Sequence, residues 1–188
     1  VLPNRTLIIH STLVTVPTDV STIQQAINNA ENGDTIIVLP GTYNENLNIS
    51  KNITLKSNFY ISNDTNIIDT TIINGTQTSN VITINNSCPK IFGLTITNGL
   101  GRGISCSESS PYLKNLIISN NNGVNSGGGG GLFFDYGSPV IENTIIRNNT
   151  ACFGGAIYTT GANLKIRNVL FKSNSATNGC GFGGIGGA

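Results

Sequence analysis

Four segments of the sequence are copies of one pattern. They begin at Pro89, Pro111, Pro139 and Leu164 and read PKIFGLTITNG, PYLKNLIISNN, PVIENTIIRNN and LKIRNVLFKSN. Equivalent positions lie 22 to 28 residues apart along the chain. Repeats of this length are typical of solenoids, in which each repeat forms one coil and contacts only the coils next to it.

The repeats share four fixed positions. The first is aliphatic, at Ile91, Leu113, Ile141 and Ile166. Two residues later comes Gly or Asn, at Gly93, Asn115, Asn143 and Asn168. The third position is apolar, at Ile96, Ile118, Ile146 and Phe171. Another aliphatic residue precedes each segment by seven residues, at Ile82, Ile104, Leu132 and Ile157. Because Gly and Asn enter the left-handed region most readily, the second position predicts a tight turn.

Within the repeats, apolar residues alternate at period two and Ile, Val, Leu and Thr dominate, which predicts strands rather than helices. We therefore expect an all-β fold, a parallel β-helix whose coils stack about 4.8 Å apart. The alternation places one column inside the core, at Ile84, Cys106, Phe134 and Thr159. Amide side chains are expected to form a hydrogen-bonded ladder at Asn98, Asn120 and Asn148.

One helix is expected, at about residues 21–30. Ser21 and Gln24 have the spacing of a capping box. The apolar stripe of this helix consists of Ile23, Ala26, Ile27 and Ala30. Such a helix would cover the exposed strand edge of the first coil. We expect a lead-in strand in residues 1–19 and a single β-helix domain over 20–188, with coils from about 34 and no matching C-terminal cap.

Two sets of phrases resemble known families. TIQQAINNAENGDTIIVLPGTY and NLNISKNITLKS resemble the N-terminal part of the pectin-lyase-like parallel β-helix superfamily. FGGAIY and FKSN resemble the GGA(I/L/V) and FxxN repeats of chlamydial polymorphic outer-membrane proteins and related surface adhesins. The resemblance covers roughly residues 20–185 and implies a right-handed parallel β-helix solenoid. It implies little about activity, because one solenoid supports many functions.

Charge and hydropathy exclude some classes of partner. Charged residues make up 10% of the chain, with ten Lys and Arg against nine Asp and Glu. This balance argues against a nucleic-acid-binding protein, which would show a basic surface. The sequence has no apolar run long enough to span a membrane. We therefore expect neither a nucleic-acid partner nor direct membrane insertion.

Candidate catalytic residues are sparse. The resemblance implies that an enzyme on this fold would use clustered carboxylates, in some families with Arg, Lys or Ca²⁺. The acids of interest are Asp64 and Asp69 in one loop, Asp135 at an outward position, and Glu142. His10 is the only histidine and precedes the repeats. We interpret these residues as surface, turn or strand positions, and expect no catalytic residue, metal or cofactor.

Glu142 has a structural interpretation. It shares a column with Lys114 of the preceding coil and Arg167 of the following coil. Opposite charges on neighbouring strands attract one another. The pattern therefore predicts an ion-pair ladder on the surface.

The cysteines indicate a disulfide more than a metal site. Cys152 and Cys180 both lie five residues before the aliphatic anchor of their coil, so the register stacks them within disulfide range. We predict a bond between them; the alternative is two small buried or loop thiols. Cys106 is expected in the core, unbonded to Cys88, which lies at another register. Zinc is not expected, because CxxC is absent.

Seven sequons permit N-glycosylation. They lie at Asn4, Asn48, Asn52, Asn63, Asn74, Asn85 and Asn148. A chain with so many Asn, Ser and Thr residues would contain several sequons by chance. They are therefore compatible with a secreted glycoprotein but carry little weight.

Two outward columns are candidate binding surfaces. Phe133 and Tyr158 occupy one column on adjacent coils, with Tyr136 nearby, and exposed aromatic rings can hold a sugar or a partner. Cross-strand packing alone is the alternative. The second column is an aliphatic stripe at Thr95, Ile117, Ile145 and Leu170. An exposed stripe predicts that another chain or segment packs there, whereas a register error of one residue would place it in the core.

Three functions remain open. The favoured one is a non-catalytic structural or adhesive module of an extracellular or cell-surface protein or fibre, which self-associates head-to-tail or laterally, or stacks on a following domain. The second is a non-catalytic glycan-binding module that uses the aromatic column. The third is a polysaccharide lyase or hydrolase, which the scaffold favours and the sparse carboxylates disfavour.

Overall fold

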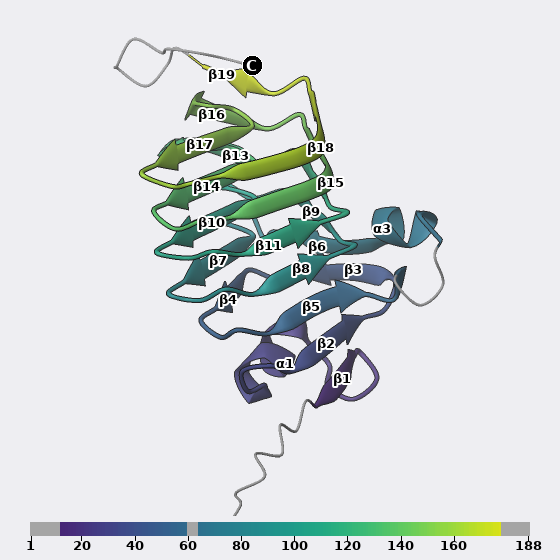
Figure 1. Cartoon of the computed structure of the whole chain (residues 1–188). Coiled ribbons are helices and arrows are strands. Elements are labelled where there is room, and N and C mark those ends of the chain that lie inside the picture. The colour runs from purple at the N-terminus through teal and green to yellow at the C-terminus, as the bar shows by residue number, and fades with distance from the viewer. Residues whose placement is uncertain (1–11, 60–63, 178–188) are drawn as a thin grey trace, which may run out of the picture.

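The chain forms a parallel β-helix (Figure 1). The computed structural model describes residues 12–59 and 64–177. Three sheets run along the solenoid axis, and the third begins only at Asn122. The strand pairing within the sheets is parallel, as between β10 (Ile104–Ser107) and β14 (Leu132–Asp135). The predicted fold class is therefore confirmed.

Sheet A is the largest sheet and has two arms. The first arm contains β1 (Leu13–Val16), β2 (Thr35–Val38), β5 (Thr54–Ser57), β8 (Lys90–Phe92) and β11 (Tyr112–Lys114). The second arm contains β3 (Gly41–Asn44), β6 (Thr71–Asn74), β9 (Thr95–Thr97) and β12 (Ile117–Ser119). Two long strands, β15 (Val140–Arg147) and β18 (Lys165–Lys172), run through both arms and join them.

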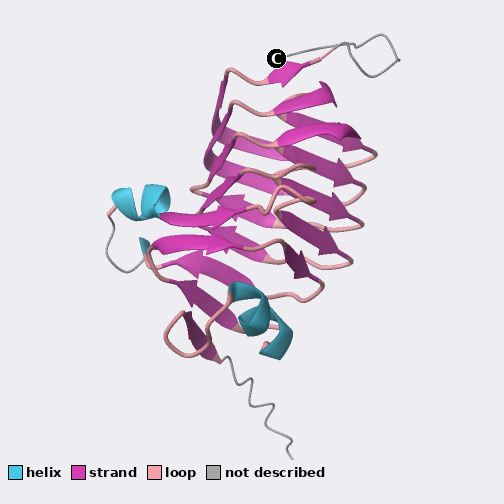
Figure 2. Cartoon of the chain, turned by 180° about the vertical axis from the view of Figure 1, so that it is seen from behind, coloured by secondary structure: helices cyan, strands magenta, loops and turns pink. Residues whose placement is uncertain are grey.

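Sheets B and C are smaller, and sheet C contains strands of the later coils only. Sheet B contains β10 and β14 together with β4 (Leu47–Ile49), β7 (Ile82–Asn85) and β17 (Ile157–Thr160). Sheet C contains β13 (Asn122–Gly128), β16 (Thr150–Phe153) and β19 (Ser175–Ala176). Two helices, α1 (Ile23–Asn29) and α3 (Asn66–Thr70), flank the coils (Figure 2). No helix in the described part of the chain has the length and apolarity of a membrane span.

The predicted register is confirmed. The column that begins at Ile91 pairs through Leu113 and Ile141, and the columns that begin at Ile96 and Ile82 pair as expected. The inward side chains are buried in a continuous aliphatic core as far as β15, whereas Ile166 and Phe171 on β18 are 44% and 41% exposed. Thr159 also departs from the prediction, because it is exposed. It lies on β17, whose described sheet neighbour is β14 alone, so no described strand covers it from the other side.

Left-handed residues mark the corners of the coil. The column of Gly and Asn residues that was predicted to form a tight turn lies where the two arms of sheet A meet. Its members have positive φ, at Gly93, Asn115, Asn143 and Asn168. Two more columns share this geometry, one at Asn86, Glu108, Tyr136 and Gly161 and one at Asn98, Asn120, Asn148 and Ser173. Glu108 and Tyr136 were not predicted there, because the residue types that favour a left-handed turn are absent. Stacking on the neighbouring corners sets their backbone conformation.

The predicted amide ladder is confirmed in part. Asn98 bonds along the stack, because its side-chain NH₂ group donates to the Asn74 carboxamide oxygen at 2.6 Å, but no described hydrogen bond joins the side chain of Asn120 or Asn148 to a side chain of a neighbouring coil. Their left-handed backbone turns the chain at the corner, and Asn120 and Asn148 are exposed. The next residue points inward instead, so the buried ladder consists of Asn121 and Asn149 and ends at half-buried Asn174.

Helix α1 covers the first coil, as predicted, but its N-cap is Thr22 rather than Ser21. The Thr22 hydroxyl accepts a hydrogen bond from the backbone N–H of Gln25 at 3.2 Å. Thr22 has the extended backbone that an N-cap requires, and Ser21 lies one residue outside the helix. The buried side of α1 consists of Ile23, Ala26 and Ile27, and the helix contacts β1, β2 and β4.

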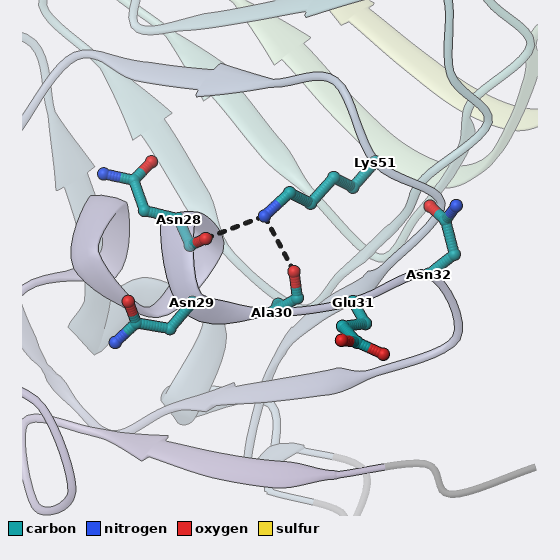
Figure 3. A pocket seen from close by; sticks show the side chains of 6 residues that line it. All are labelled: Asn28, Asn29, Ala30, Glu31, Asn32 and Lys51. Carbon is teal, nitrogen blue, oxygen red and sulfur yellow. Dashed lines mark hydrogen bonds between the residues drawn. The ribbon is translucent and has the colours of Figure 1, made fainter.

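Two charged side chains of the first coil hold the ends of α1. The Glu45 carboxylate accepts the backbone N–H groups of Ile23 and Gln24, each at 2.9 Å. The Lys51 ammonium donates to the carbonyl oxygens of Asn28 and Ala30 at 2.8 and 2.7 Å (Figure 3) and to that of Ile27 at 3.1 Å. An anion at the N-terminus and a cation at the C-terminus match the helix dipole and satisfy unpaired backbone groups.

Replacing Lys51 by Met is expected to lower the free energy of unfolding by about 1.5–3 kcal/mol, because three carbonyls lose a charged donor. Lys56→Met is the matched control, because no described hydrogen bond involves the Lys56 side chain. The control is expected to change stability by less than about 0.5 kcal/mol. Urea unfolding followed by circular dichroism measures both. Equal stabilities of the two variants would contradict the capping role of Lys51.

Candidate anion-binding face

The candidate acids lie on different faces of the solenoid. Asp64 precedes α3 and Asp69 belongs to it, while Asp135 lies on β14 of sheet B and Glu142 on β15 of sheet A. The Asp64 carboxylate accepts the backbone N–H of Asn66 at 2.9 Å, which is a turn-forming bond. In residues 12–59 and 64–177, no group of three or more His, Cys, Asp or Glu is placed to hold a metal ion. His10 lies outside the described residues.

Cations gather on the outward surface of the first arm of sheet A. One outward column pairs Lys90, Tyr112, Val140 and Lys165. The next outward column on the same strands pairs Lys56, Phe92, Lys114, Glu142 and Arg167. We call the side chains of Lys56, Lys90, Lys114, Lys165 and Arg167 the basic face. Glu142 is the one acid in these two columns of the described strands, so positive charge dominates this surface.

The predicted ion-pair ladder is confirmed, and a tyrosine completes it. The Glu142 carboxylate lies 3.7 Å from the Lys114 ammonium and 3.3 Å from the Arg167 guanidinium. The Tyr112 hydroxyl donates to the same carboxylate at 2.6 Å. This hydrogen bond, helped by the two cations, lowers the pKa of Glu142, and it raises the pKa of Tyr112. Glu142 is therefore ionised at neutral pH and orients its two cationic neighbours.

The remaining cations of the basic face have no carboxylate beside them. No described ion pair involves Lys56, Lys90 or Lys165, and the side chains of Lys90 and Lys165 are exposed. Aromatic rings lie between the cations, because Phe92 separates Lys56 from Lys114 within one column. The rings of Phe92 and Tyr112 meet edge to face at 5.4 Å. The face thus combines cations with half-buried aromatic surface.

The balanced composition conceals this concentration of charge. Residues 1–70 carry three Lys and Arg against six Asp and Glu, whereas residues 71–188 carry seven against three. Lys114 was predicted on the surface through its pairing with Glu142, but Lys56, Lys90 and Lys165 were missed. The repeats do indicate that Lys90 and Lys165 point outward, because alternation at period two places the second and fourth residues of each segment on the outer surface.

The aromatic column on sheet B has the predicted register, and its rings pack on one another although Tyr158 and Tyr136 are 39% and 57% exposed. Phe133 pairs with Tyr158, and their rings stack at 6.0 Å with an interplanar angle of 10°. The Arg102 guanidinium, from the preceding coil, lies 3.9 Å from the centroid of the Phe133 ring. Phe153 also packs against Tyr158 at 6.2 Å. This geometry favours packing along the stack; glycan binding at Phe133, Tyr158 and Tyr136 stays a prediction.

The aliphatic stripe on the second arm points outward, and its register is as predicted. Thr95 and Ile117 are nevertheless only 8% exposed. A segment of the same chain explains the burial of Thr95, because its hydroxyl donates to the Ile68 carbonyl of α3 at 2.7 Å. Ile145 is half-buried and Leu170 is 55% exposed, so the stripe is open toward β18.

The predicted modifications remain predictions. Cys180 lies outside the described residues, so its bond to Cys152 on β16 is untested. Cys106 is buried in the core and Cys88 is exposed, and both are free thiols, as expected. Among the sequons, Asn48, Asn52, Asn85 and Asn148 are exposed, and the Asn74 amide is hydrogen-bonded to Asn44 and Asn98. Asn4 and Asn63 lie outside the described residues.

Comparisons with known proteins show the fold but no family. No protein-family model and no curated protein matches the sequence. Among solved structures, an alginate lyase from Paenibacillus sp. str. FPU-7 is similar with a TM-score of 0.61 and 15% identity, over 89% of this chain and 69% of that chain. A pectin methylesterase mutant in complex with a hexasaccharide is similar with a TM-score of 0.55 and 15% identity, over 88% and 67% of the two chains. At this identity, the likeness establishes a shared β-helix architecture.

Proposed function

We propose that this chain is a non-catalytic, extracellular adhesive module that binds acidic polysaccharide through the basic face. The observation that carries the proposal is the concentration of five cations on one sheet surface that holds a single carboxylate. The cations recur along the axis in steps of the strand spacing, about 4.8 Å. A uronate polymer, with one carboxylate on each sugar, presents a row of negative charges with a comparable repeat.

The aromatic residues of the basic face support a sugar ligand over an inorganic anion. Phe92 and Tyr112 offer apolar ring surface between the cations. Pyranose rings have apolar faces as well as hydroxyl groups, so they pack on aromatic side chains. The Glu142 carboxylate holds Lys114 and Arg167 in place, which reduces the conformational entropy that binding must remove.

The structural neighbours support the same chemical class. One is named for alginate and the other for pectin, and both are polymers of uronic acids. The adhesive interpretation also draws on the resemblance of the repeats to those of surface adhesins. The dispersal of Asp64, Asp135 and Glu142 over different surfaces argues against a paired-carboxylate catalytic centre among these candidates. A stiff solenoid with continuous backbone ladders suits the proposed role as a surface module.

Calorimetric titration with a short oligogalacturonate is expected to show binding that weakens as the salt concentration rises, because the attraction is between exposed charges. Reversing two charges of the basic face, with Lys90→Glu and Lys165→Glu combined, is expected to weaken binding by about tenfold or more. A neutral oligosaccharide of equal length is expected not to bind.

The matched control reverses two cations of the second arm, Arg147 and Lys172, both to Glu. These residues are exposed and lie on β15 and β18, and β18 also carries Lys165 and Arg167 of the basic face. The control variant has the same net charge as the test variant, and we expect it to bind almost as tightly as the native chain. Equal weakening by both variants would show an effect of net charge alone and would contradict a site on the basic face.

A further inference from the structure

The second arm of sheet A carries a ridge. Helix α3 projects from the side of the solenoid over this arm (Figures 1 and 2). The bond from the Thr95 hydroxyl to the Ile68 carbonyl holds the helix against β9. Phe59, from the chain that leads to α3, lies over the corner residue Gly93, where an added Cβ would come within 3.3 Å of the Phe59 Cβ. We call α3 together with Asp64 the acidic ridge.

A trough begins where the acidic ridge ends and runs toward β18. A hollow of about 270 Å³ is lined by Ile68 and Asp69 of α3 and by Ile117 and Ile145 of the sheet, so the acidic ridge forms one of its walls. A second hollow of about 340 Å³ continues past Ile145 to Leu170. Asn143 and Ile145 line both hollows, so the two form one continuous trough. Its floor is the open end of the aliphatic stripe.

The ridge and the trough carry opposite charges. Asp64 and Asp69 are exposed on the ridge. Arg147 and Lys172 are paired in register and exposed, two residues beyond Ile145 and Leu170 on the same strands. The ridge therefore presents aliphatic and acidic groups, and the trough presents an aliphatic floor beside basic groups. The charges of the ridge and of the groups beside the trough are therefore opposite in sign.

We infer that two copies of this chain associate side by side through the second arm, with the acidic ridge of each copy in the trough of the other. Ridge and trough lie on one face and are displaced along the solenoid axis. A two-fold rotation about a line perpendicular to that axis brings each onto its complement, which makes the interface self-complementary. The same rotation places the first described coils of one chain, where acids outnumber cations, beside the last described coils of the other, where cations outnumber acids.

Lateral pairing differs from assembly through the coil ends. Helix α1 covers the strand edge of the first coil, so stacking of another coil there would require its displacement. The two-fold arrangement leaves α1 in place. It also leaves the basic face uncovered, because that face belongs to the first arm. The pairing therefore does not depend on the proposed polysaccharide binding.

Sedimentation equilibrium over a range of protein and salt concentrations tests this inference. We expect a monomer–dimer equilibrium that weakens with salt. Leu170→Ser is expected to reduce the association constant by about tenfold, because an exposed side chain of the trough floor loses its contact. The control is Leu13→Ser on β1, a similarly exposed leucine at the far end of sheet A, and it is expected to leave the association constant unchanged.

Charge reversal provides the sharper test. The variant Asp69→Lys and the double variant Arg147→Glu with Lys172→Glu are each expected to be monomeric, because like charges then meet at both contacts. Mixing the two variants pairs a reversed ridge with a reversed trough and a native ridge with a native trough. The mixture is therefore expected to form heterodimers. Circular dichroism is used to check that each variant is folded.

Three results would overturn the inference. A native chain that stays monomeric up to about 0.5 mM at low salt lacks the interface. Growth beyond dimers with rising concentration indicates a head-to-tail contact rather than a two-fold one. A mixture of the charge-reversal variants that remains monomeric shows that the acidic ridge and the trough do not meet.

Discussion

Replacing Ile146 by Asp is expected to abolish cooperative folding of the repeat region. Ile146 is 0% exposed and lies in the core column between Ile118 and Phe171. A carboxylate there has no partner in the aliphatic core, and burying a charge or an unpaired polar group costs several kcal/mol. Loss of the packed side chain costs a further 2–5 kcal/mol or so. The total stability of a domain is only about 5–15 kcal/mol.

Ile145→Asp is the matched control, because it changes the same residue type on the same strand. The Ile145 side chain points outward into the trough and is half-buried. We expect this variant to remain folded and to lose dimerisation instead. Thermal unfolding followed by circular dichroism compares the two variants. A folded Ile146→Asp protein together with an unfolded Ile145→Asp protein would show that the register is shifted by one residue.

Replacing Asn149 by Ala is expected to lower the free energy of unfolding by about 3 kcal/mol or more. Asn149 is 0% exposed. Its side-chain NH₂ group donates to the Ile118 carbonyl at 2.9 Å and to the Asn174 carboxamide oxygen at 3.0 Å. Its own carboxamide oxygen accepts the backbone N–H and the side-chain NH₂ group of Asn121 at 3.0 and 2.9 Å. The Ala variant removes these four bonds, while the Asn121 side chain keeps its bond to the Ile96 carbonyl and the Asn174 oxygen keeps its bond from the backbone N–H of residue 149.

Asn148→Gly provides the control for the ladder. Asn148 precedes Asn149, is exposed, and has a φ of 55°, which Gly adopts without strain. We expect its stability to change by less than about 0.5 kcal/mol. Urea denaturation of both variants measures the difference in the free energy of unfolding. If the two variants were equally stable, the buried ladder would contribute little to holding successive coils together.

The repeats predict the coils well because their signal is redundant. Each coil repeats the same alternation and the same corner, so the register of Ile91, Leu113 and Ile141 follows from spacing alone. The predictions were less accurate where they had to assign a role to one of two adjacent residues. Thr22 rather than Ser21 caps α1, and Asn121 rather than Asn120 joins the ladder. In each case, neighbouring residues of similar type differ in backbone conformation, which the sequence pattern does not specify.

The surface features were predicted only in part. The pairing of Lys114, Glu142 and Arg167 follows from register, and the structure confirms it. The basic face as a whole was missed because overall charge is balanced, and a balanced total hides where the charges lie. The cover over Thr95 was missed because residues 58–70 lie outside the repeat pattern. Such an insertion has no periodic signal that would place it on a particular face.

Chemical-shift mapping with a short oligogalacturonate tests the proposed function most directly. The isotopically labelled chain is titrated with the oligosaccharide, and the perturbed backbone and side-chain signals are placed on the structure. We predict perturbations confined to the outward positions of β5, β8, β11 and the first halves of β15 and β18, with Lys90, Tyr112 and Lys165 among the strongest. Perturbations centred on Phe133 and Tyr158 of sheet B, or no perturbation at low salt, would contradict polysaccharide binding by the basic face.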